Sequence, residues 1–248
     1  MRESLIYGAA THTGLVRANN EDHYAILDHD GSYPCALILA DGMGGHRRGE
    51  LASQIAVDYV KERLTGEFEH DLPGTDFGRT LTDILEKANV KVFLGSLASE
   101  DNRGMGTTLT LAVLLPDQLL LAHIGDCRAY LLRENSLSRL TVDHTLVQEM
   151  IDAGTITPEE AVRHPRRNIL TRALGVPEYL QPDLLTIEIQ RGDRLLLCSD
   201  GLHGFVPEDD IKALMRKDKT PAILAEHLIK LALDAGGEDN VTVLAAFV

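Results

Sequence analysis

Three apolar segments of the chain follow one another too closely for helices to connect them. Thr107–Leu115, Leu119–Ile124 and Arg128–Leu132 have strand-like composition, and three residues separate each segment from the next. Parallel neighbours need a crossover of a dozen or more residues, so these strands are predicted to be antiparallel. The spacing argues against the regular alternation of strands and helices that builds a doubly wound sheet.

Other segments extend this pattern over the whole chain. Helices are predicted where apolar residues recur every three or four positions, around residues 51–60, 81–92 and 224–235. Short apolar runs bounded by turn residues predict further strands at Leu5–Ala10, Tyr24–Leu27, Ala36–Ala40, Leu184–Ile189, Arg194–Cys198 and Val241–Val248. The order of these elements predicts an α+β fold, with antiparallel strands in the core and amphipathic helices on the outer faces.

Turn and capping residues set several boundaries. Thr157 to Glu160 form a capping box with proline at the first helical position, so a short helix is predicted to begin there. Gly154 is predicted to end the helix before it, and Pro207 to open another. The polar stretch Gly66–Gly78 is predicted to be a loop too short to separate domains, so residues 1–248 are expected to form a single domain.

The chain is strongly acidic, with a formal net charge of −14 over 248 residues. Nucleic acids and anionic membrane surfaces are bound by basic patches, so neither is expected as a partner. Hydrophobic residues make up 44% of the chain, enough to form a substantial core without disulfides. Most of the acids are expected to be solvated, and the informative ones are those at the ends of strands.

The cysteines indicate a reducing compartment rather than a disulfide framework. Cys35, Cys127 and Cys198 lie in or beside apolar runs, where they are expected to be small buried side chains. No signal peptide precedes the first predicted strand, and no apolar run approaches the roughly 18 residues that cross a bilayer. A soluble, cytoplasmic protein is therefore expected, with a monomer as its expected state.

Five aspartates lie at the ends of predicted strands. Asp41 and Asp200 each follow an apolar run and precede a glycine, a pattern that taken singly is more typical of a turn than of a site. Asp22 precedes one strand, Asp126 lies between two strands, and Asp239 precedes the last strand. If these acids converge at one edge of the sheets, they raise each other's pKa, and Mg²⁺ or Mn²⁺ held by oxygen ligands removes the repulsion.

Gly42 has a use of its own beside such a cation, because a residue without a side chain lets a backbone carbonyl approach it. Other motifs are excluded. Gly42–Gly49 lacks the Lys-Ser/Thr of a P-loop, and Arg47 stands where the third glycine of a dinucleotide fingerprint belongs. The chain has neither His-Glu-x-x-His nor paired Cys-x-x-Cys, and Ser199 lacks the flanking glycines of a hydrolase nucleophile elbow.

Eight short motifs are spread along essentially the whole chain. They are Thr13-Gly14-Leu15-Val16-Arg17 with Asn20-Glu21-Asp22, Asp41-Gly42-Met43-Gly44-Gly45-His46, Gly104-Met105-Gly106-Thr107-Thr108, Gly125-Asp126-Cys127-Arg128, Asp143-His144-Thr145, Leu170-Thr171-Arg172-Ala173-Leu174-Gly175, Cys198-Ser199-Asp200-Gly201-Leu202 and Gly237-Glu238-Asp239-Asn240-Val241-Thr242. Each motif is weak alone. In this order, they resemble the metal-dependent protein phosphatases, also called type 2C serine/threonine phosphatases, in their compact bacterial form.

The resemblance implies a four-layer α-β-β-α sandwich, in which two mainly antiparallel sheets are flanked by helices. It implies an enzyme that hydrolyses phosphoserine and phosphothreonine in phosphorylated proteins and opposes a bacterial protein kinase. The reaction would be the attack of a water that bridges two cations, Mn²⁺ or Mg²⁺, without a covalent phosphoenzyme. No cysteine is therefore expected to act as a nucleophile.

The family's metal ligands map onto this chain residue by residue. Asp41 would bridge both cations, and Gly42 would give its carbonyl to one of them. Asp200 and Asp239 would bind the other cation, and Asn240 would support the geometry.

The family's remaining site residues map in the same way. Glu21 and Asp22 would hold metal-bound waters from the second shell of ligands, and Arg17 would bind the substrate phosphate with its planar donor fork. Asp126 would help to bind a third, weaker cation beside a flap at about residues 144–172.

The sequence departs from the family's pattern at two positions. In many eukaryotic relatives a histidine directly follows the Asp-Gly and is proposed to protonate the leaving alcohol, but that position is Met43 here. The nearest histidine is His46, a candidate for proton donation, for orienting the substrate or for a place on the surface. Cys127 replaces a more usual serine, a change that is expected to be tolerated. Met43 and Met105 are expected to be packing residues.

A structural role is favoured for most groups of the flap-like segment. His144 and His164 are expected to cap or bridge loops. The segment also has a basic cluster, made by Arg163, Arg166, Arg167 and Arg172. This cluster is expected to form a solvated face, and contact with a phosphopeptide is the alternative.

Two other functions stay open. A phosphatase-like binding module without catalysis is disfavoured by the presence of Asp41, Asp200, Asp239 and Arg17, because a degenerate member is expected to lose some metal acids. A phosphatase dedicated to one signalling protein in a partner-switching pathway differs in substrate rather than in mechanism. Such a phosphatase usually comes with a sensory domain, of which the sequence shows no sign.

Overall fold

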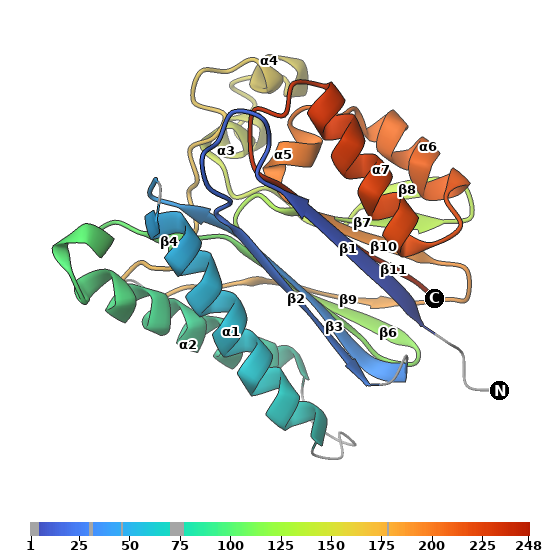
Figure 1. The fold of residues 1–248 in the computed structure, drawn as a ribbon, viewed down its shortest axis with the longest axis horizontal. Coiled ribbons are helices and arrows are strands. Elements are labelled where there is room, and N and C mark those ends of the chain that lie inside the picture. Colours follow the sequence, from blue (N-terminus) through green and yellow to red (C-terminus); the bar gives the residue numbers. More distant parts are fainter. Residues whose placement is uncertain (1–4, 30–31, 46, 70–76, 178) are drawn as a thin grey trace.

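The structure is a computed structural model that describes residues 5–29, 32–45, 47–69, 77–177 and 179–248. Its strands form two sheets packed face to face, and helices cover both outer faces (Figure 1). Neighbouring strands in the described part of the chain are antiparallel. The α-β-β-α sandwich of two mainly antiparallel sheets is therefore confirmed.

Each sheet combines strands from distant parts of the sequence. The five-stranded sheet has the order β1 (Ile6–His12), β11 (Val241–Phe247), β10 (Arg194–Cys198), β7 (Arg128–Arg133) and β8 (Ser136–Arg139). The six-stranded sheet has the order β2 (Asp22–His29), β3 (Ser32–Met43), β5 (Leu109–Leu114), β6 (Gln118–Ile124) and β9 (Asp183–Glu188), and the short β4 (Gly106–Thr107) pairs with the end of β3.

The close spacing of the strands between residues 107 and 132 predicts their pairing only in part. β5 and β6 are antiparallel neighbours, as predicted. β7, however, leaves the six-stranded sheet and pairs with β8 and β10 in the other one. A three-residue connection is long enough to cross from one sheet to the other at the end of a sandwich, and Asp126 lies in this crossing.

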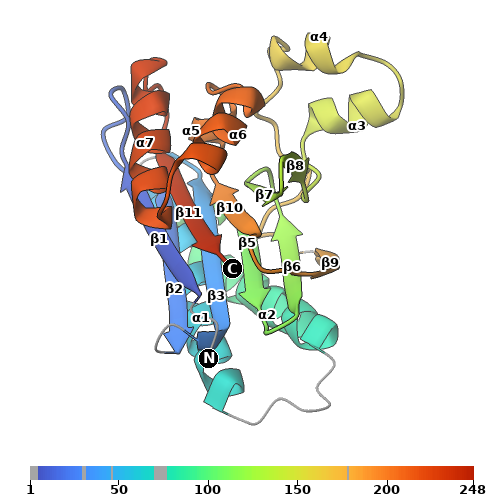
Figure 2. The ribbon, with the colours of Figure 1, turned by 90° about the vertical axis from the view of Figure 1, so that its right-hand side faces the viewer.

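The helices divide between the two faces. The six-stranded sheet is covered by α1 (Arg47–Glu69) and α2 (Phe77–Leu97), which is followed by a short 3-10 helix (Glu100–Asn102). The five-stranded sheet is covered by α5 (Asp200–His203), α6 (Glu208–Lys217) and α7 (Pro221–Asp234). Figure 2 shows α3 (Leu146–Asp152) and α4 (Pro158–Val162) projecting beyond one end of the sheets. Of the helices described, none has the length and apolar character to cross a bilayer.

The alternation of side chains along β3 shows how three apolar layers arise. Leu37 and Leu39 point between the two sheets, whereas Ala36, Ile38 and Ala40 point toward α1 and α2, and all five are fully buried. Successive residues of a strand face opposite sides, so a strand with both faces covered is apolar throughout. A third apolar layer lies between the five-stranded sheet and helices α5–α7.

Capping was predicted well from the sequence. Thr157 N donates to Glu160 Oε2 at 2.8 Å and Glu160 N donates to Thr157 Oγ1 at 3.3 Å, so the capping box is present at the start of α4. Gly154 follows α3 with a φ of +67°, a conformation that glycine adopts without strain. α6 begins directly after Pro207, as predicted.

The predicted loop over Gly66–Gly78 is wrong at both ends. α1 continues to Glu69 and α2 begins at Phe77, and residues 70–76 lie outside the described part of the chain. Phe68 packs against the core and Phe77 is buried, so apolar contacts with the sheet extend both helices beyond the polar composition of this stretch. β8 and α5 were not predicted, because both are short and lack an apolar run.

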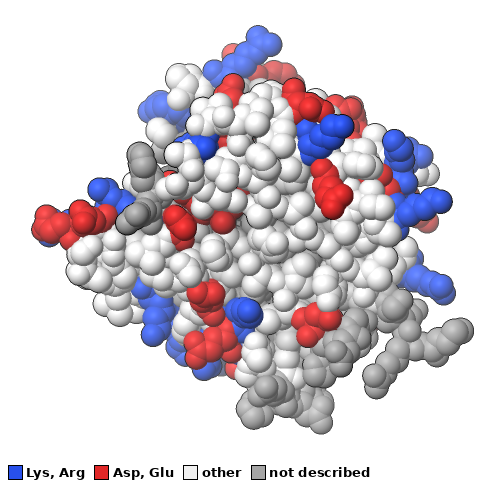
Figure 3. Space-filling model, viewed as in Figure 1, with Lys and Arg blue, Asp and Glu red and all other residues white. Residues whose placement is uncertain are grey.

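Charged side chains of both signs are interspersed on the face of the molecule seen in Figure 3. The described residues form no continuous basic patch on this face, despite the local cluster of arginines in the sequence.

Substitutions in the layer beneath α1 and α2 test the packing. Leu111→Ala is expected to lower the free energy of unfolding by about 2–5 kcal/mol, because Leu111 is fully buried there and its loss leaves a cavity. Leu94→Ala is a matched control, since Leu94 is 56% exposed on α2, and it should change the free energy by under about 0.5 kcal/mol. Urea denaturation in EDTA measures both values. Equal losses in the two variants would contradict this description of the core.

Candidate active site

The five aspartates predicted from the sequence gather at one end of the sandwich. In antiparallel neighbours the end of one strand lies beside the start of the next. β1 ends at His12 beside Val241, where β11 begins, and β2 begins with Asp22 at the same end. The loop after β1 and helix α5 lie there as well (Figure 1).

Asp22 and Asp41 are partners across the β2–β3 pair. Asp22 is buried, and its Oδ2 accepts hydrogen bonds from Ser199 Oγ at 2.8 Å and from Thr242 Oγ1 at 2.7 Å. Its Oδ1 is buried with no hydrogen-bond partner among the described residues. A buried acceptor without a donor is costly, so this oxygen has capacity for a further partner.

The two Asp-Gly pairs are not turns. Asp41 and Gly42 continue β3, which changes partners here and pairs Gly42 with Thr107 in β4. Asp200 is instead the first residue of α5. The Asp-Gly pattern, which taken singly predicts a turn, therefore lies in a strand in one case and at the start of a helix in the other.

Gly42 lies where three backbone segments meet. A Cβ at this position would lie 2.0 Å from Gly49 O and 2.7 Å from Glu21 O. Gly42 N also donates to Glu21 O at 3.1 Å. Close packing of backbone therefore requires glycine here, which is a different reason from the approach of a carbonyl to a cation.

Burial and mutual repulsion raise the pKa values of the clustered acids. Burial is the main cause for Asp22, whose pKa rises to about 7, and for Asp200, whose pKa rises to about 6 with a further contribution from the charge of Asp239. Burial also raises the pKa of Asp41 and Asp126 well above the usual range, and neighbouring aspartates raise both further. These carboxylates are close enough to repel one another.

Arg17 forms an ion pair with one member of the cluster. Its Nη2 lies 2.8 Å from Asp239 Oδ2, and about half of the Arg17 side chain is exposed. A guanidinium has five N–H donors, so Arg17 keeps donors for an anion that arrives from solvent. Among the described basic residues, Arg17 alone forms an ion pair within 4 Å with one of the five aspartates.

Asn240 connects the segments that carry Arg17, Glu21 and Asp239. Its Nδ2 donates to Thr13 O and to Asn19 O, each at 2.8 Å. Its Oδ1 accepts from Glu21 N at 2.7 Å, and its backbone N donates to Asp239 Oδ1 at 2.8 Å. One buried amide thus satisfies backbone groups on both sides of the site.

Asp126 lies in the crossing between β6 and β7, beside a cavity of about 390 Å³. Asp126, Asp200 and Asp239 line one side of this cavity, and residues of α3 and α4 line the other. His203 also lines it and donates from Nε2 to Asp126 O at 2.9 Å. Because a carbonyl can only accept, the ring carries its proton on Nε2, and burial lowers the pKa of His203 to about 3. His203 was not predicted from the sequence, although it lies three residues after Asp200 on the same helix.

The basic cluster does not form one solvated face. Arg167 lines the cavity that Asp126 also lines, and its guanidinium lies 6.0 Å from the centre of the Phe205 ring. Arg172 is instead paired with Asp183 at 2.8 Å. Arg163 and Arg166 are exposed, as the favoured interpretation expects.

The remaining sequence predictions give mixed results. Met105 is buried in the core, and Met43, although 36% exposed, packs its side chain over Gly106, so both are packing residues as expected. Cys127 is buried with Sγ 3.2 Å from Thr108 Oγ1, and burial raises the pKa of its thiol. His46, the candidate proton donor, lies outside the described residues.

The chemistry of the cluster suits divalent cations. Its groups are carboxylate and backbone oxygens, which Mg²⁺ and Mn²⁺ prefer, and repulsion among the acids disappears when a cation binds them. The described His, Cys, Asp and Glu side chains do not already form a cage of three or more ligands. The fit therefore rests on the donor set, on the raised pKa values and on the partnerless Asp22 Oδ1.

Comparisons with known proteins identify the family. A family model described as protein phosphatase 2C matches residues 13–230. The serine/threonine phosphatase stp of Listeria monocytogenes serotype 4b is 39% identical over 234 residues, which are 94% of this chain and 92% of that protein. The solved structure of serine/threonine phosphatase Stp1 from Staphylococcus aureus matches with a TM-score of 0.90 at 34% identity, over 100% of this chain and 96% of that one.

A second solved structure contains metal. It is the catalytic domain of the serine/threonine protein phosphatase PstP in complex with two manganese ions. It matches with a TM-score of 0.84 at 41% identity and covers 98% of each chain.

Removing one buried acid tests the electrostatic description. Above about pH 4 an unfolded Asp22 ionises, whereas the folded carboxyl keeps its proton up to about pH 7, so this residue destabilises the metal-free fold increasingly as pH rises between these values. Asp22→Asn removes this penalty. The variant should therefore gain stability relative to the wild type as pH rises from about 4 to about 7, measured by thermal unfolding in EDTA.

The comparison has to be made between the two proteins at each pH. His123 and His203 have lowered pKa values, so they favour the folded state as pH rises through part of the same range, and they do so equally in both proteins. A difference in stability that does not change with pH would contradict the raised pKa of Asp22.

Proposed function

The chain belongs to the protein phosphatase 2C family, and from that premise we propose that it removes phosphate from phosphoserine and phosphothreonine in phosphorylated proteins, with Mn²⁺ or Mg²⁺ as its cofactor. The observation that carries the proposal is the cluster of five aspartates, two of them buried and three partly buried, beside the half-exposed Arg17. A monomeric state, a cytoplasmic location and a bacterial protein kinase as the opposing enzyme remain predictions from the sequence.

The metal centre is assigned to oxygen atoms of the cluster. The cations would be held by the carboxylates of Asp41, Asp200 and Asp239 and by the carbonyl of Gly42. Bound there, divalent cations supply Lewis acidity to the phosphoryl group and activate water for hydrolysis. Asp126 would contribute to a third cation site on the side of the cavity.

Glu21 and Asp22 support the centre from inside the protein. Asp22 Oδ2 already accepts two hydrogen bonds, from Ser199 and Thr242, so the free Oδ1 is the atom available to a cation's hydration water. Glu21 is held by its backbone, which bonds to Gly42 and Asn240. These contacts fix the positions of both acids before a cation binds.

Arg17 recognises the phosphate. A planar guanidinium can donate two parallel hydrogen bonds to a phosphate, and the exposed half of Arg17 faces solvent. Its contact with Asp239 orients the guanidinium beside the metal ligands. The buried thiols of Cys127 and Cys198 have raised pKa values, caused mainly by burial, so neither serves as a nucleophile.

Hydrolysis of a phosphothreonine peptide, followed with and without Mn²⁺ or Mg²⁺, tests the function. Asp41→Asn and Asp239→Asn are expected to abolish the cation-dependent rate while the far-UV circular dichroism spectrum stays unchanged. Arg17→Ala is expected to lower kcat/KM by at least about a hundredfold, the size of effect seen when one electrostatic contact to a transition state is removed.

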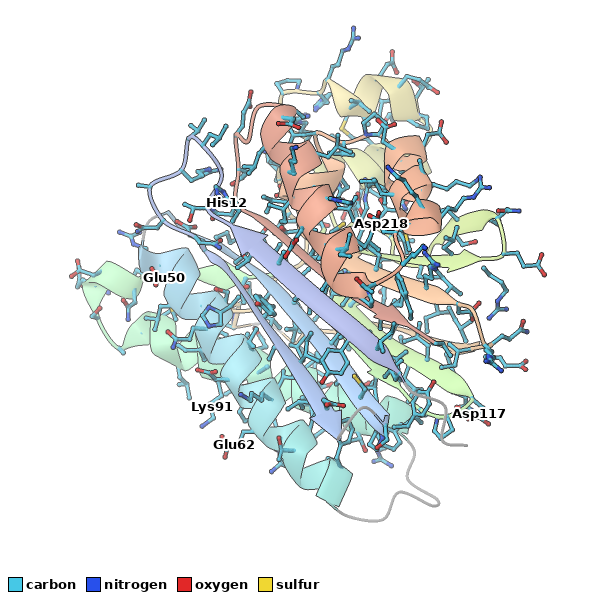
Figure 4. All side chains as sticks on the ribbon, turned by 45° about the vertical axis from the view of Figure 1, so that its right-hand side comes forward. His12, Glu50, Glu62, Lys91, Asp117 and Asp218 are labelled. Carbon is cyan, nitrogen blue, oxygen red and sulfur yellow. The ribbon has the colours of Figure 1, made fainter. Side chains whose placement is uncertain are left out.

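Asp117→Asn is the matched control. Asp117 is exposed at the turn before β6, and Figure 4 labels it at the opposite end of the sheets from His12, which adjoins the site. This variant should keep the wild-type rate. An active Asp239→Asn protein would contradict the metal assignment, and a wild-type protein inactive with either cation would contradict the function.

His46 is tested through the leaving group. A general acid assists a poor leaving group most, so a proton donor at His46 would make His46→Ala slow an alkyl phosphate much more than a phenyl phosphate. The two kcat/KM ratios measure this difference. Equal losses on both esters would assign protonation to another group.

A further inference from the structure

The segment after β8 runs beside the connection that carries Asp126. Leu140 N donates to Ala129 O at 2.8 Å, and Ala129 N donates to Thr141 Oγ1 at 3.1 Å. Arg128 donates to the Asp143 carboxylate from Nε at 3.0 Å and from Nη2 at 2.6 Å. These contacts hold the connection along its β7 end.

Farther along the same segment, His144 contacts Gly125, the residue directly before Asp126. Its backbone N donates to Gly125 O at 2.8 Å, and Gly125 N donates to its ring Nδ1 at 3.1 Å. Gly125 has a φ of +108°, and a Cβ there would lie 2.4 Å from Thr108 Cγ2, so its backbone has little freedom. Asp126 follows directly, so the direction of its side chain depends on how Gly125 is held.

The partners of His144 determine which nitrogen carries the ring proton. Because Nδ1 accepts from Gly125 N–H, the neutral ring has its proton on Nε2, which donates to Asp183 Oδ2 at 3.1 Å. Arg172 Nη1 lies 3.2 Å from Nε2 but donates to Asp183 Oδ1 at 2.8 Å. Two protonated nitrogens cannot form a hydrogen bond, so Arg172 acts on the ring through Asp183.

The same groups lie at the base of the segment that carries α3 and α4. Thr171 N donates to His144 O at 2.8 Å, and Leu146 N donates to Ile169 O at 2.8 Å. Both ends of this segment therefore meet at His144, whose side chain is almost completely buried. Three separate parts of the chain thus fix His144: the segment's base bonds to its backbone, and Gly125 and the start of β9 bond to its ring.

We propose that His144 is a positioning residue for the Asp126 carboxylate, held in one orientation by Asp183 and Arg172. It touches neither the substrate nor the cations and acts through the backbone of Gly125. This inference rests on the proposed function, in which Asp126 helps to bind a third cation. Removal of a group that orients a metal ligand without touching the metal typically weakens metal affinity by about 10–100-fold.

Two amide substitutions separate the two hydrogen bonds of the ring. In His144→Asn the side-chain oxygen can take the place of Nδ1 and accept from Gly125 N–H. In His144→Gln the amide reaches the place of Nε2, so Gly125 N–H loses its acceptor. We expect the third and weakest Mn²⁺ binding step of the full chain, measured by titration calorimetry, to be about tenfold or more weaker in His144→Gln than in His144→Asn. The two tighter steps should match the wild type in both variants.

A remote histidine–aspartate pair provides the control. His227 Nδ1 on α7 lies 2.9 Å from Oδ2 of Asp218, which directly follows α6 and is labelled in Figure 4. His227→Asn and His227→Gln should bind Mn²⁺ like the wild type. A purely structural role for His144 would lower the melting temperature of both His144 variants and leave their third Mn²⁺ steps equal.

Asp183→Ala is a second route if His144→Gln does not fold. It keeps the ring beside Gly125 but removes the carboxylate that orients it, so a several-fold weaker third step is expected, against no change in Asp117→Ala. Equal third steps in the two His144 variants, a wild-type Asp183→Ala titration, or only two Mn²⁺ bound by the wild type would overturn the proposal. Failure of the wild type to hydrolyse a phosphopeptide would refute the proposed function but would leave the Mn²⁺ comparison interpretable.

Discussion

The burial of several carboxylates at one end of the sandwich is the constraint on which the rest of the structure depends. Asp22 and Asp41 face each other across β2 and β3, and burial raises the pKa of both. A buried acid loses its hydration and repels its neighbours, so the cluster destabilises the metal-free fold. Three apolar layers, built largely from strands that are buried on both faces, offset this cost.

The acids can lie close together because the backbones that carry them do. A Cβ at Gly42 would collide with Gly49 O, and one at Gly201 would lie 2.0 Å from Asn240 O. Gly14 has a φ of +85° and a similarly close approach, 2.3 Å, to Asp239 O. These three motif glycines therefore allow close packing of backbone segments around the site. Asn240 holds the loop after β1, and His144 and His203 hold the connection between β6 and β7, by hydrogen bonds with backbone groups.

Much of the fold could be predicted from the sequence, because short-range patterns report local structure. The apolar alternation in β3, the capping box at Thr157 and the start of α6 each depend on residues a few positions apart. The errors lie where distant contacts decide. β7 changes sheets, and the ends of α1 and α2 are extended by contacts of Phe68 and Phe77 with a distant part of the core.

The sequence by itself determined which acids are present, that they stand at strand ends, and which family their motifs resemble. Only the tertiary structure decided which of them meet and what holds them. Ser199 donates to Asp22 across 177 residues of sequence, and Arg17 reaches Asp239 across 222. Tertiary structure also brings His203 to Asp126 O and His144 to Gly125 N. These partners determine the tautomers of both histidines. Local patterns carry no information about such contacts, because they form only when the two sheets pack and bring opposite parts of the chain to one end of the sandwich.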